Sequence, residues 1–268
     1  MSPTFHRLSP FVGVEIRGLD PRAPDDAGRR VVRDALAAHH LVLIRGYELD
    51  EEQQVRLSEA VGSVSSRGGK GYAKAGRRVS HVSNMHDDGV FRDGELSFHA
   101  DLSFLEHLLS ARSLYALVLP STGGDTMFSN VGVAYDELPA ATKARIAGRS
   151  ARHAITYERD GVAYVDEFVR PLVEPHPDTG RPVLTASRAV TKEILGMERA
   201  EFRPLLKELW AHIEDPRYVY RHRWQLRDYV LWDNVALQHA RTHFDPGEKR
   251  ALRAVSIDSP RIAQLTAA

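Results

Sequence analysis

Residues 95–104 read ELSFHADLSF, a stretch in which apolar residues alternate with polar ones around a histidine and an aspartate. The alternation is typical of a short β-strand. Residues two apart in a strand point to the same face, so His99 and Asp101 would project together, with only the small Ala100 between them. An isolated pair of this kind is often a surface pair on a half-exposed strand, and the rest of the chain decides which interpretation holds.

Similar strand candidates continue along the chain from Arg77 onward, separated by turns that contain Gly, Pro and Asp. They are RRVSHVSN (77–84), ARSLYALVLP (111–120), DTMFSN (125–130), ARHAITYE (151–158), GVAYVDEF (161–168), RPVLTAS (181–187), YVYRHRW (218–224), DYVLWDN (228–234) and LRAVSI (252–257). Many short strands with turn signals favour an antiparallel sandwich or barrel over alternating βαβ units. We therefore predict a mainly β protein with flanking helices, a jelly roll (double-stranded β-helix).

Helical segments flank and interrupt these strands. Residues 25–40 have apolar residues at helical spacing and are followed by the short strand candidate LVLIRG (41–46), and residues 51–62 have acidic residues in their first turn. The main helical interruptions later in the chain are residues 133–148 and 197–213. Neither a Pro/Gly/Ser-rich linker nor an internal repeat divides the sequence, so we expect residues 1–268 to form a single domain.

The composition limits the classes of partner and of metal site. The chain has 36 basic (Lys+Arg) and 36 acidic (Asp+Glu) residues, which gives no overall charge that would favour nucleic acid or a membrane surface, so we expect a small-molecule partner. Because cysteine is absent, any metal must be held by nitrogen and oxygen ligands. No stretch approaches the ~18 apolar residues of a membrane-spanning helix, and the first residues do not resemble a signal peptide. We expect a cytoplasmic protein and leave homo-oligomerisation open.

A second candidate segment, LWDNVALQHARTH (231–243), contains His239, which lies 140 positions after His99. A jelly roll can bring strands that are distant in sequence to one mouth of the barrel. If these strands are neighbours, His239 completes a set of two histidines and one carboxylate with open coordination positions, which is the ligand set of non-haem Fe(II) oxygenases. A zinc hydrolase can use the same ligand types, so the ligands alone leave the reaction open.

Two arginines follow in HFDPGEKRALRAVSI (243–257). Arg250 lies 11 residues beyond His239, and Arg253 lies 14 residues beyond it. A guanidinium group suits a carboxylate because it offers parallel donors to both oxygens. A dicarboxylate cosubstrate that chelates the metal at one end would need such a clamp at its other end.

Taken together, these segments resemble the Fe(II)- and 2-oxoglutarate-dependent dioxygenases of the taurine dioxygenase and 2,4-D dioxygenase group. The similarity covers residues 40–258 and runs in order through LPSTGGDTMFSNVGVAYDELP (119–139), HPDTGRPVLTAS (176–187), HRWQLRDYVLWDNVALQHA (222–240) and the arginine segment. This ordered series is far more specific than the His-x-Asp pair alone.

The resemblance implies a role for each matching residue. His99, Asp101 and His239 would bind Fe(II), and Thr126 and Arg250 would bind the distal carboxylate of 2-oxoglutarate. The family often has a second arginine four positions after the first, near a carboxylate or an anionic substrate. Here Arg253 comes three positions after Arg250, so it either contacts the cosubstrate or forms a salt bridge on the outer face.

The resemblance also implies the reaction. Fe(II), 2-oxoglutarate and O₂ would oxidise an unactivated C–H bond of a small molecule, with release of succinate and CO₂. Hydroxylation is the default outcome, and desaturation or oxidative dealkylation are alternatives. Because Asp101 is present, halogenation is disfavoured. Two rival interpretations remain. A jelly-roll metal hydrolase or isomerase would have no use for Thr126 and Arg250 together, and a non-catalytic small-ligand binding module should not require the metal triad.

The substrate residues are less well defined. Glu95, four positions before His99, matches a substrate contact in the taurine enzyme's pattern, and Lys70 and Tyr72 lie in a glycine-rich segment, RGGKGYAKAGRR (67–78), that resembles a lid. His243 would face the pocket if a helical turn follows His239. A carboxylate for an amine and a lysine for an anion indicate an amino acid derivative as the substrate. Taurine itself is not expected, because the substrate residues of the taurine enzyme are not reproduced as a recognisable set.

Overall fold

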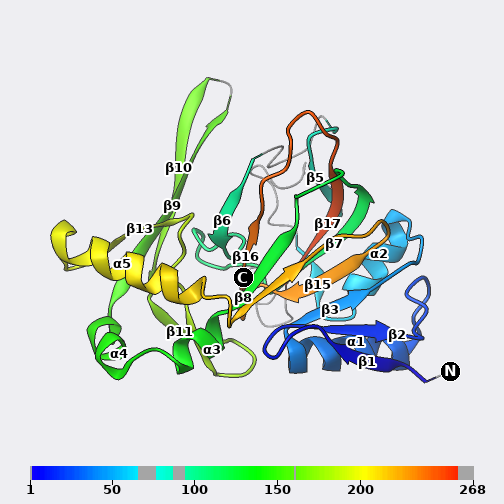
Figure 1. Ribbon diagram of the computed structural model, residues 1–268, viewed down its shortest axis with the longest axis horizontal. Helices are drawn as coiled ribbons and strands as arrows, with labels where there is room; N and C mark the ends of the chain where they lie inside the picture. Colours follow the sequence, from blue (N-terminus) through cyan, green and yellow to red (C-terminus); the bar gives the residue numbers. More distant parts are fainter. Residues whose placement is uncertain (1, 66–76, 87–93, 160, 259–268) are drawn as a thin grey trace.

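The computed structural model describes residues 2–65, 77–86, 94–159 and 161–258, and two β-sheets form its centre (Figure 1). The larger sheet has the order β1 (Thr4–Arg7), β2 (Val14–Arg17), β3 (Leu41–Ile44), β15 (Tyr229–Asp233), β7 (Ala111–Val118), β17 (Ala251–Asp258) and β4 (Ser63–Val64), and β5 (Ser80–Ser83) also pairs with β17. The smaller sheet has the order β14 (Val219–His222), β8 (Thr126–Asn130), β16 (Leu237–Arg241) and β6 (Leu96–His99). Neighbouring strands are mostly far apart in sequence, as a jelly roll requires.

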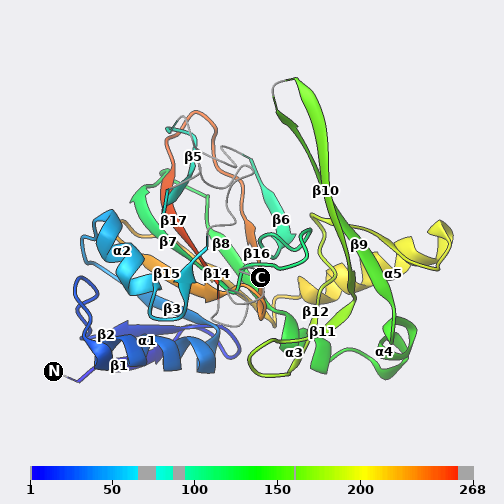
Figure 2. The ribbon, with the colours of Figure 1, turned by 180° about the vertical axis from the view of Figure 1, so that it is seen from behind.

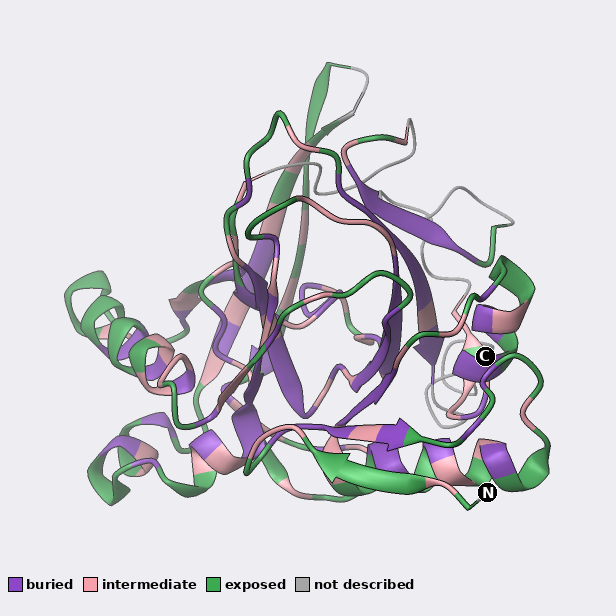
Figure 3. Ribbon diagram, turned by 45° about the vertical axis from the view of Figure 1, so that its right-hand side comes forward, coloured by how far each residue is buried: buried purple, intermediate pink, exposed green. Residues whose placement is uncertain are grey.

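An apolar core lies between the two sheets because the strands alternate their side chains. On β7, Leu114 and Ala116 join this core together with Phe128 of the smaller sheet, whereas Ala111 and Tyr115 belong to a second core on the opposite face. The central strands are therefore buried on both faces (Figure 3). The mainly β jelly roll predicted from the sequence is confirmed.

Two helices cover the outer face of the larger sheet (Figure 2). Helix α1 (Asp26–His39) begins where the Asp25 side chain accepts a hydrogen bond from the Gly28 N–H at 2.8 Å. Helix α2 (Glu51–Ser58) begins with a capping box between Asp50 and Gln53. Both helices were predicted. None of the helices in the described part of the chain has the length and apolar character needed to span a bilayer.

A third core lies on the other side of the molecule, around α5 (Arg199–Ile213), α3 (Val131–Asp136) and α4 (Ala140–Ile146). The predicted helical segment 133–148 is divided because Pro139 cannot continue α3 and disfavours helical geometry at Leu138. The remaining strands are β9 (Ser150–Arg159), β10 (Val162–Pro171) and β13 (Thr191–Ile194) in one sheet, and β11 (Val173–Pro175) with β12 (Pro182–Leu184) in another. The β9–β10 hairpin projects away from the two central sheets (Figure 1).

Candidate metal and cosubstrate site

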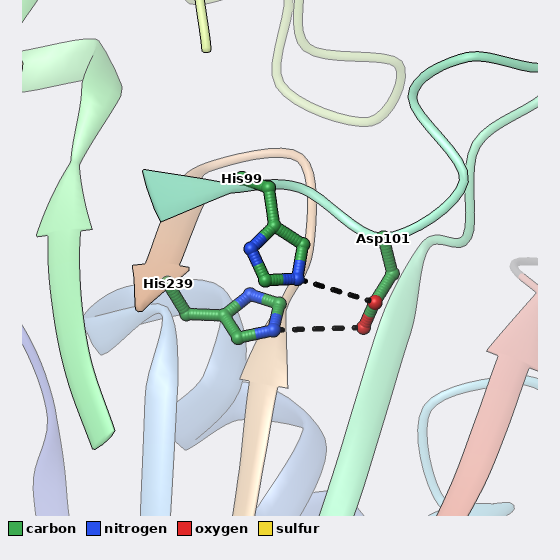
Figure 4. Close-up of side chains that lie close together, drawn as sticks. All are labelled: His99, Asp101 and His239. Atoms are coloured by element: carbon green, nitrogen blue, oxygen red, sulfur yellow. Dashed lines mark ion pairs between the residues drawn. The ribbon is translucent and has the colours of Figure 1, made fainter. Parts of the chain in front are cut away.

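The two histidines predicted as ligands are direct neighbours across a strand pair. β16 pairs with β6 in a register that places His239 opposite His99, and their ring centroids lie 4.3 Å apart. Asp101 Oδ1 lies 3.8 Å from His99 Nε2, and Asp101 Oδ2 lies 3.8 Å from His239 Nε2 (Figure 4). The three side chains thus meet at one point, with all three candidate ligand atoms within 4.8 Å of one another.

Asp101 reaches this point from a turn. Strand β6 ends at His99, so the expectation that both residues share one strand is wrong. The turn is held by Asn234, whose Oδ1 accepts from the Asp101 N–H at 2.9 Å and whose Nδ2 donates to the Asp101 carbonyl at 3.0 Å. Asn234 belongs to the WDN segment, and sequence reasoning assigned it no role. The strand ends here because the backbone groups of Asp101 bond to this side chain and leave the strand ladder.

The charge states of the three side chains suit a divalent metal. His99 Nδ1 lies 2.8 Å from the Ser97 carbonyl and donates to it, which leaves the Nε2 lone pair facing Asp101. Burial lowers the pKa of His239 to about 3, so its imidazole is neutral near pH 7. Burial alone would raise the pKa of Asp101, but the nearby Arg112 and the two histidines outweigh it and hold the pKa at about 2. Two imidazoles, of which the His239 ring is neutral, and one carboxylate fit the facial ligand set of Fe(II).

A cavity that opens to solvent adjoins these residues. Its described lining consists of His99, Asp101, His239, three arginines (Arg112, Arg241 and Arg250), Thr126, and the apolar residues Val82, Leu96, Leu114, Trp232 and Ala240. The predicted residues Thr126 and Arg250 therefore share one cavity with the candidate metal ligands.

Arg250 is a buried cation with unused donors. Its side chain is among the largest that are fully buried, and Nη2 donates to the Gly124 carbonyl at 3.0 Å, whereas Nε and Nη1 have no hydrogen-bond partner among the described residues. Burial lowers its pKa to about 9. A Cβ on Gly124, which has φ +68°, would lie 2.9 Å from Arg250 Nε, so a glycine is needed here. A bound carboxylate would satisfy both unused donors.

Thr126 is oriented by Trp224, a residue that sequence reasoning missed. Trp224 Nε1 donates to Thr126 Oγ1 at 3.0 Å. The indole N–H can only donate, so the threonine oxygen must accept there and its own hydrogen is free to point to another acceptor. Thr126 is 3% exposed and lines the cavity. Trp224 lies in the HRWQL segment, which resembles the family. Nothing local in this segment indicates a contact with a residue 98 positions earlier.

Arg253 lies on the other face of the larger sheet. Its Nε donates to Gln54 Oε1 at 2.7 Å, and its Nη2 donates to the Leu49 carbonyl at 2.7 Å and to the Asp50 carbonyl at 3.0 Å. Because side chains alternate along a strand, an odd spacing of three from Arg250 places Arg253 on the opposite face. It contributes nothing to the cavity lining, and we leave it out of the proposed site.

The residues predicted to contact substrate are not brought together. Glu95 and His243 are exposed and do not belong to the cavity lining, although the His243 carbonyl accepts from the Gly124 N–H at 3.2 Å. Lys70 and Tyr72 lie outside the described residues. The arginines Arg112 and Arg241, which do line the cavity, had no predicted role.

A jelly roll with two histidines and a carboxylate beside a buried arginine with unpaired donors is typical of the class of non-haem iron dioxygenases that use a keto-acid cosubstrate. The family comparison agrees. The model of the taurine catabolism dioxygenase TauD, TfdA family matches residues 4–256, and the chain belongs to this family. The enzyme class and the cofactors predicted from the sequence, Fe(II), 2-oxoglutarate and O₂, are thereby confirmed.

Several relatives are similar over most of their length. The chain is 31% identical over 252 residues to an alpha-ketoglutarate-dependent 2,4-dichlorophenoxyacetate dioxygenase of Burkholderia sp. (strain RASC), covering 84% of this chain and 83% of the relative. It is 30% identical over 265 residues to an (S)-phenoxypropionate/alpha-ketoglutarate-dioxygenase of Delftia acidovorans, covering 87% of each. The crystal structure of AAD-2 in complex with Mn(II) and N-oxalylglycine is 27% identical with a TM-score of 0.81, covering 97% of this chain and 98% of that one.

Proposed function

We propose that this chain, as a single domain spanning residues 1–268, binds Fe(II) through His99, Asp101 and His239 and 2-oxoglutarate through Thr126 and Arg250. With O₂ it oxidises an unactivated C–H bond of an organic anion, by default to the alcohol, and releases succinate and CO₂. The observation that carries this proposal is the shared cavity. The two unused donors of the buried Arg250 lie in the same cavity as three convergent metal-ligating side chains.

A dicarboxylate cosubstrate would use both the metal ligands and the buried Arg250. Its keto-acid end can bind the metal through two oxygens, and its other carboxylate can accept from Arg250 and from the Thr126 hydroxyl. N-oxalylglycine, which is present with Mn(II) in the AAD-2 structure, is a dicarboxylic acid of the same chain length as 2-oxoglutarate. A metal hydrolase or isomerase would have no use for this clamp.

Each residue has a defined part in the reaction. When bound, the iron supplies the redox chemistry that couples O₂ and 2-oxoglutarate to C–H oxidation. His99 and His239 offer ring nitrogens as ligands on one side of the cavity, and Asp101 supplies the negative charge. Thr126 and Arg250 fix the cosubstrate, and the apolar lining around them keeps a substrate C–H bond close to the metal while limiting water.

The charge of the cavity favours an anionic substrate. Three arginines line it, and Asp101 is the one acidic residue among its described lining residues. With a divalent metal bound, the three arginines and the metal still outweigh Asp101 and the two carboxylates of 2-oxoglutarate, so positive charge remains for a substrate anion. The names of two relatives specify carboxylic acids, phenoxypropionate and 2,4-dichlorophenoxyacetate. An amino acid derivative, the class expected from the sequence, would enter through its carboxylate, because Glu95 is not placed to receive an amine.

Oxidative dealkylation is the second candidate outcome. The relatives named above act on ethers of phenol. Hydroxylation of a carbon next to an ether oxygen gives a hemiacetal, which breaks down to an alcohol and a carbonyl compound. The same site would therefore dealkylate an ether or an N-alkyl amino acid and hydroxylate a substrate that has no such heteroatom.

A screen for coupled succinate formation tests the proposal. The purified chain is incubated with Fe(II), 2-oxoglutarate and O₂ together with phenoxy acids, N-acyl amino acids and N-alkyl amino acids, and each acid is paired with its neutral amide. We expect succinate and an oxidised product from at least one acid and much less from its amide. No succinate above the background without iron, from a folded protein, would instead favour a hydrolase or an isomerase.

Trp224→Phe is expected to weaken 2-oxoglutarate binding roughly three- to tenfold, because it removes one hydrogen bond worth about 0.5–1.5 kcal/mol. Phenylalanine keeps most of the packing, so iron binding and melting temperature should change little. The affinity is measured by anaerobic titration of the Mn(II)-loaded protein. In a Thr126→Val background the same change should have no further effect, and an additive loss would show that Trp224 does not act through Thr126. Trp210→Phe, outside the cavity, is the matched control.

A further inference from the structure

We propose that Arg112 is a positioning residue of the metal centre: its guanidinium holds Asp101 in place before the metal binds, and its positive charge weakens metal binding. This inference rests on the proposed function, because it takes Asp101 to be a metal ligand. It gives a role to a buried cation that the carboxylate clamp does not use.

The ion pair between these residues is short and enclosed. Arg112 Nη1 lies 2.8 Å from Asp101 Oδ2, and the side chains are 3% and 1% exposed. Water therefore screens the pair poorly, and each charge depends on the other for stabilisation. A pair this well buried is expensive to break, so the carboxylate is held in one orientation even without a metal.

The position of Arg112 on β7 shows that the guanidinium is placed toward the site. Arg112 shares the inward face of the strand with Leu114 and Ala116, which belong to the apolar core between the sheets. It pairs with Trp232 of β15, and both residues line the cavity. A buried arginine in a series of apolar inward positions needs a carboxylate within reach, and Asp101 lies at ion-pair distance from Arg112.

The same oxygen of Asp101 faces both the arginine and a candidate ligand. Oδ2 lies 2.8 Å from Arg112 Nη1 and 3.8 Å from His239 Nε2. A metal bound by His239 and Asp101 would therefore share this carboxylate with the guanidinium, and the two cations would repel each other across a poorly screened distance. Arg112 is expected to preorganise the carboxylate while keeping the metal more weakly bound than the ligand set alone would allow.

The experiment compares Arg112→Gln, which can still donate a hydrogen bond to Asp101 but has no charge, with Arg112→Lys, which keeps the charge. Arg145→Gln is the matched control, because Arg145 forms an exposed ion pair with Glu208 at 2.7 Å on the far helices. For each protein the melting temperature is measured without metal, and the Mn(II) dissociation constant is measured by calorimetry.

We expect the metal-free Arg112→Gln protein to melt several degrees lower than the wild type and to bind Mn(II) at least tenfold more tightly, while the lysine and control variants stay close to the wild type. If the glutamine variant folds only with Mn(II), removing the metal with a chelator should unfold this variant and not the wild type. That result would also show lower metal-free stability and stronger dependence on the metal. If the wild type binds Mn(II) and Arg112→Gln binds it equally well or more weakly, the inference about Arg112 is wrong and the proposed function is unaffected. Failure of the wild type to bind Mn(II) overturns the proposed function as well.

Discussion

Arg250→Ala is expected to weaken 2-oxoglutarate binding by about a hundredfold while leaving metal binding within about twofold of the wild type. Truncating one partner of a desolvated charge pair costs about 2–5 kcal/mol, or roughly 30-fold to several thousandfold in affinity, and a hundredfold loss lies near the lower end of this range. The truncation removes Nε and Nη1, the two buried donors of Arg250 that have no hydrogen-bond partner among the described residues and that a bound carboxylate would use. The metal ligands come from other strands and should keep their geometry.

The measurement is a pair of anaerobic titrations, one with Mn(II) and one with 2-oxoglutarate on the Mn(II)-loaded protein. Arg253→Ala is a matched control, because this arginine lies three positions away but bonds to Gln54 and to the backbone at Leu49 and Asp50. It should lower stability and leave 2-oxoglutarate affinity unchanged. Equal losses of both ligands in Arg250→Ala would indicate a disrupted site, and an equal effect of Arg253→Ala would contradict the assigned clamp.

His239→Ala is expected to abolish coupled succinate formation and to weaken metal binding more than about 100-fold. Loss of a residue that only supports a metal ligand typically costs 10–100-fold in metal affinity, and a ligand itself should cost more. Removing the imidazole leaves only His99 and Asp101 of the predicted set, and Asp101 is already shared with Arg112.

The control for this variant is His243→Ala, four positions along the chain, because His243 is exposed and does not line the cavity. Both variants are compared by their Mn(II) dissociation constants, by their melting temperatures and by succinate release. His243→Ala should behave like the wild type. If folded His239→Ala binds Mn(II) as the wild type does, the three-residue metal site is wrong.

The sequence predicted the fold class correctly because strands and helices produce periodic patterns in neighbouring residues. The alternation of apolar residues in ARSLYALVLP follows directly from strand geometry, and β7 spans Ala111–Val118 with one face in each core. The caps of α1 and α2 are equally local, since Asp25 and Asp50 lie directly before each helix. Pro139 carried a visible signal for dividing the predicted helical segment, but it was not used.

The site was predicted only in part. The resemblance located His99, Asp101, His239, Thr126 and Arg250, and the structure places all of them around one cavity. Asp101 was wrongly assigned to the strand that contains His99. The side chain that ends this strand belongs to Asn234, which lies 133 positions later in the sequence. Contacts of this kind leave no periodic trace in either segment.

The arginines illustrate the same distinction. The odd spacing between Arg250 and Arg253 indicated that their side chains could face opposite sides of the strand, because strand alternation has a period of two, but it left the role of Arg253 open. The partner of Arg112, by contrast, depends on how the turn after β6 meets β7, and no local pattern contains that information. Trp224 belongs to the same group, since its indole reaches Thr126 across the β14–β8 pair.

The most direct test of the central claim is an anaerobic titration that follows the visible absorption of the protein with Fe(II) and 2-oxoglutarate. If one iron held by His99, Asp101 and His239 is chelated by a keto acid that Arg250 anchors, a weak visible band should require both additions and saturate at about one equivalent of each per chain. The band should be absent in His239→Ala and should need far more 2-oxoglutarate in Arg250→Ala. A folded wild-type protein that gives no such band would contradict the proposed site.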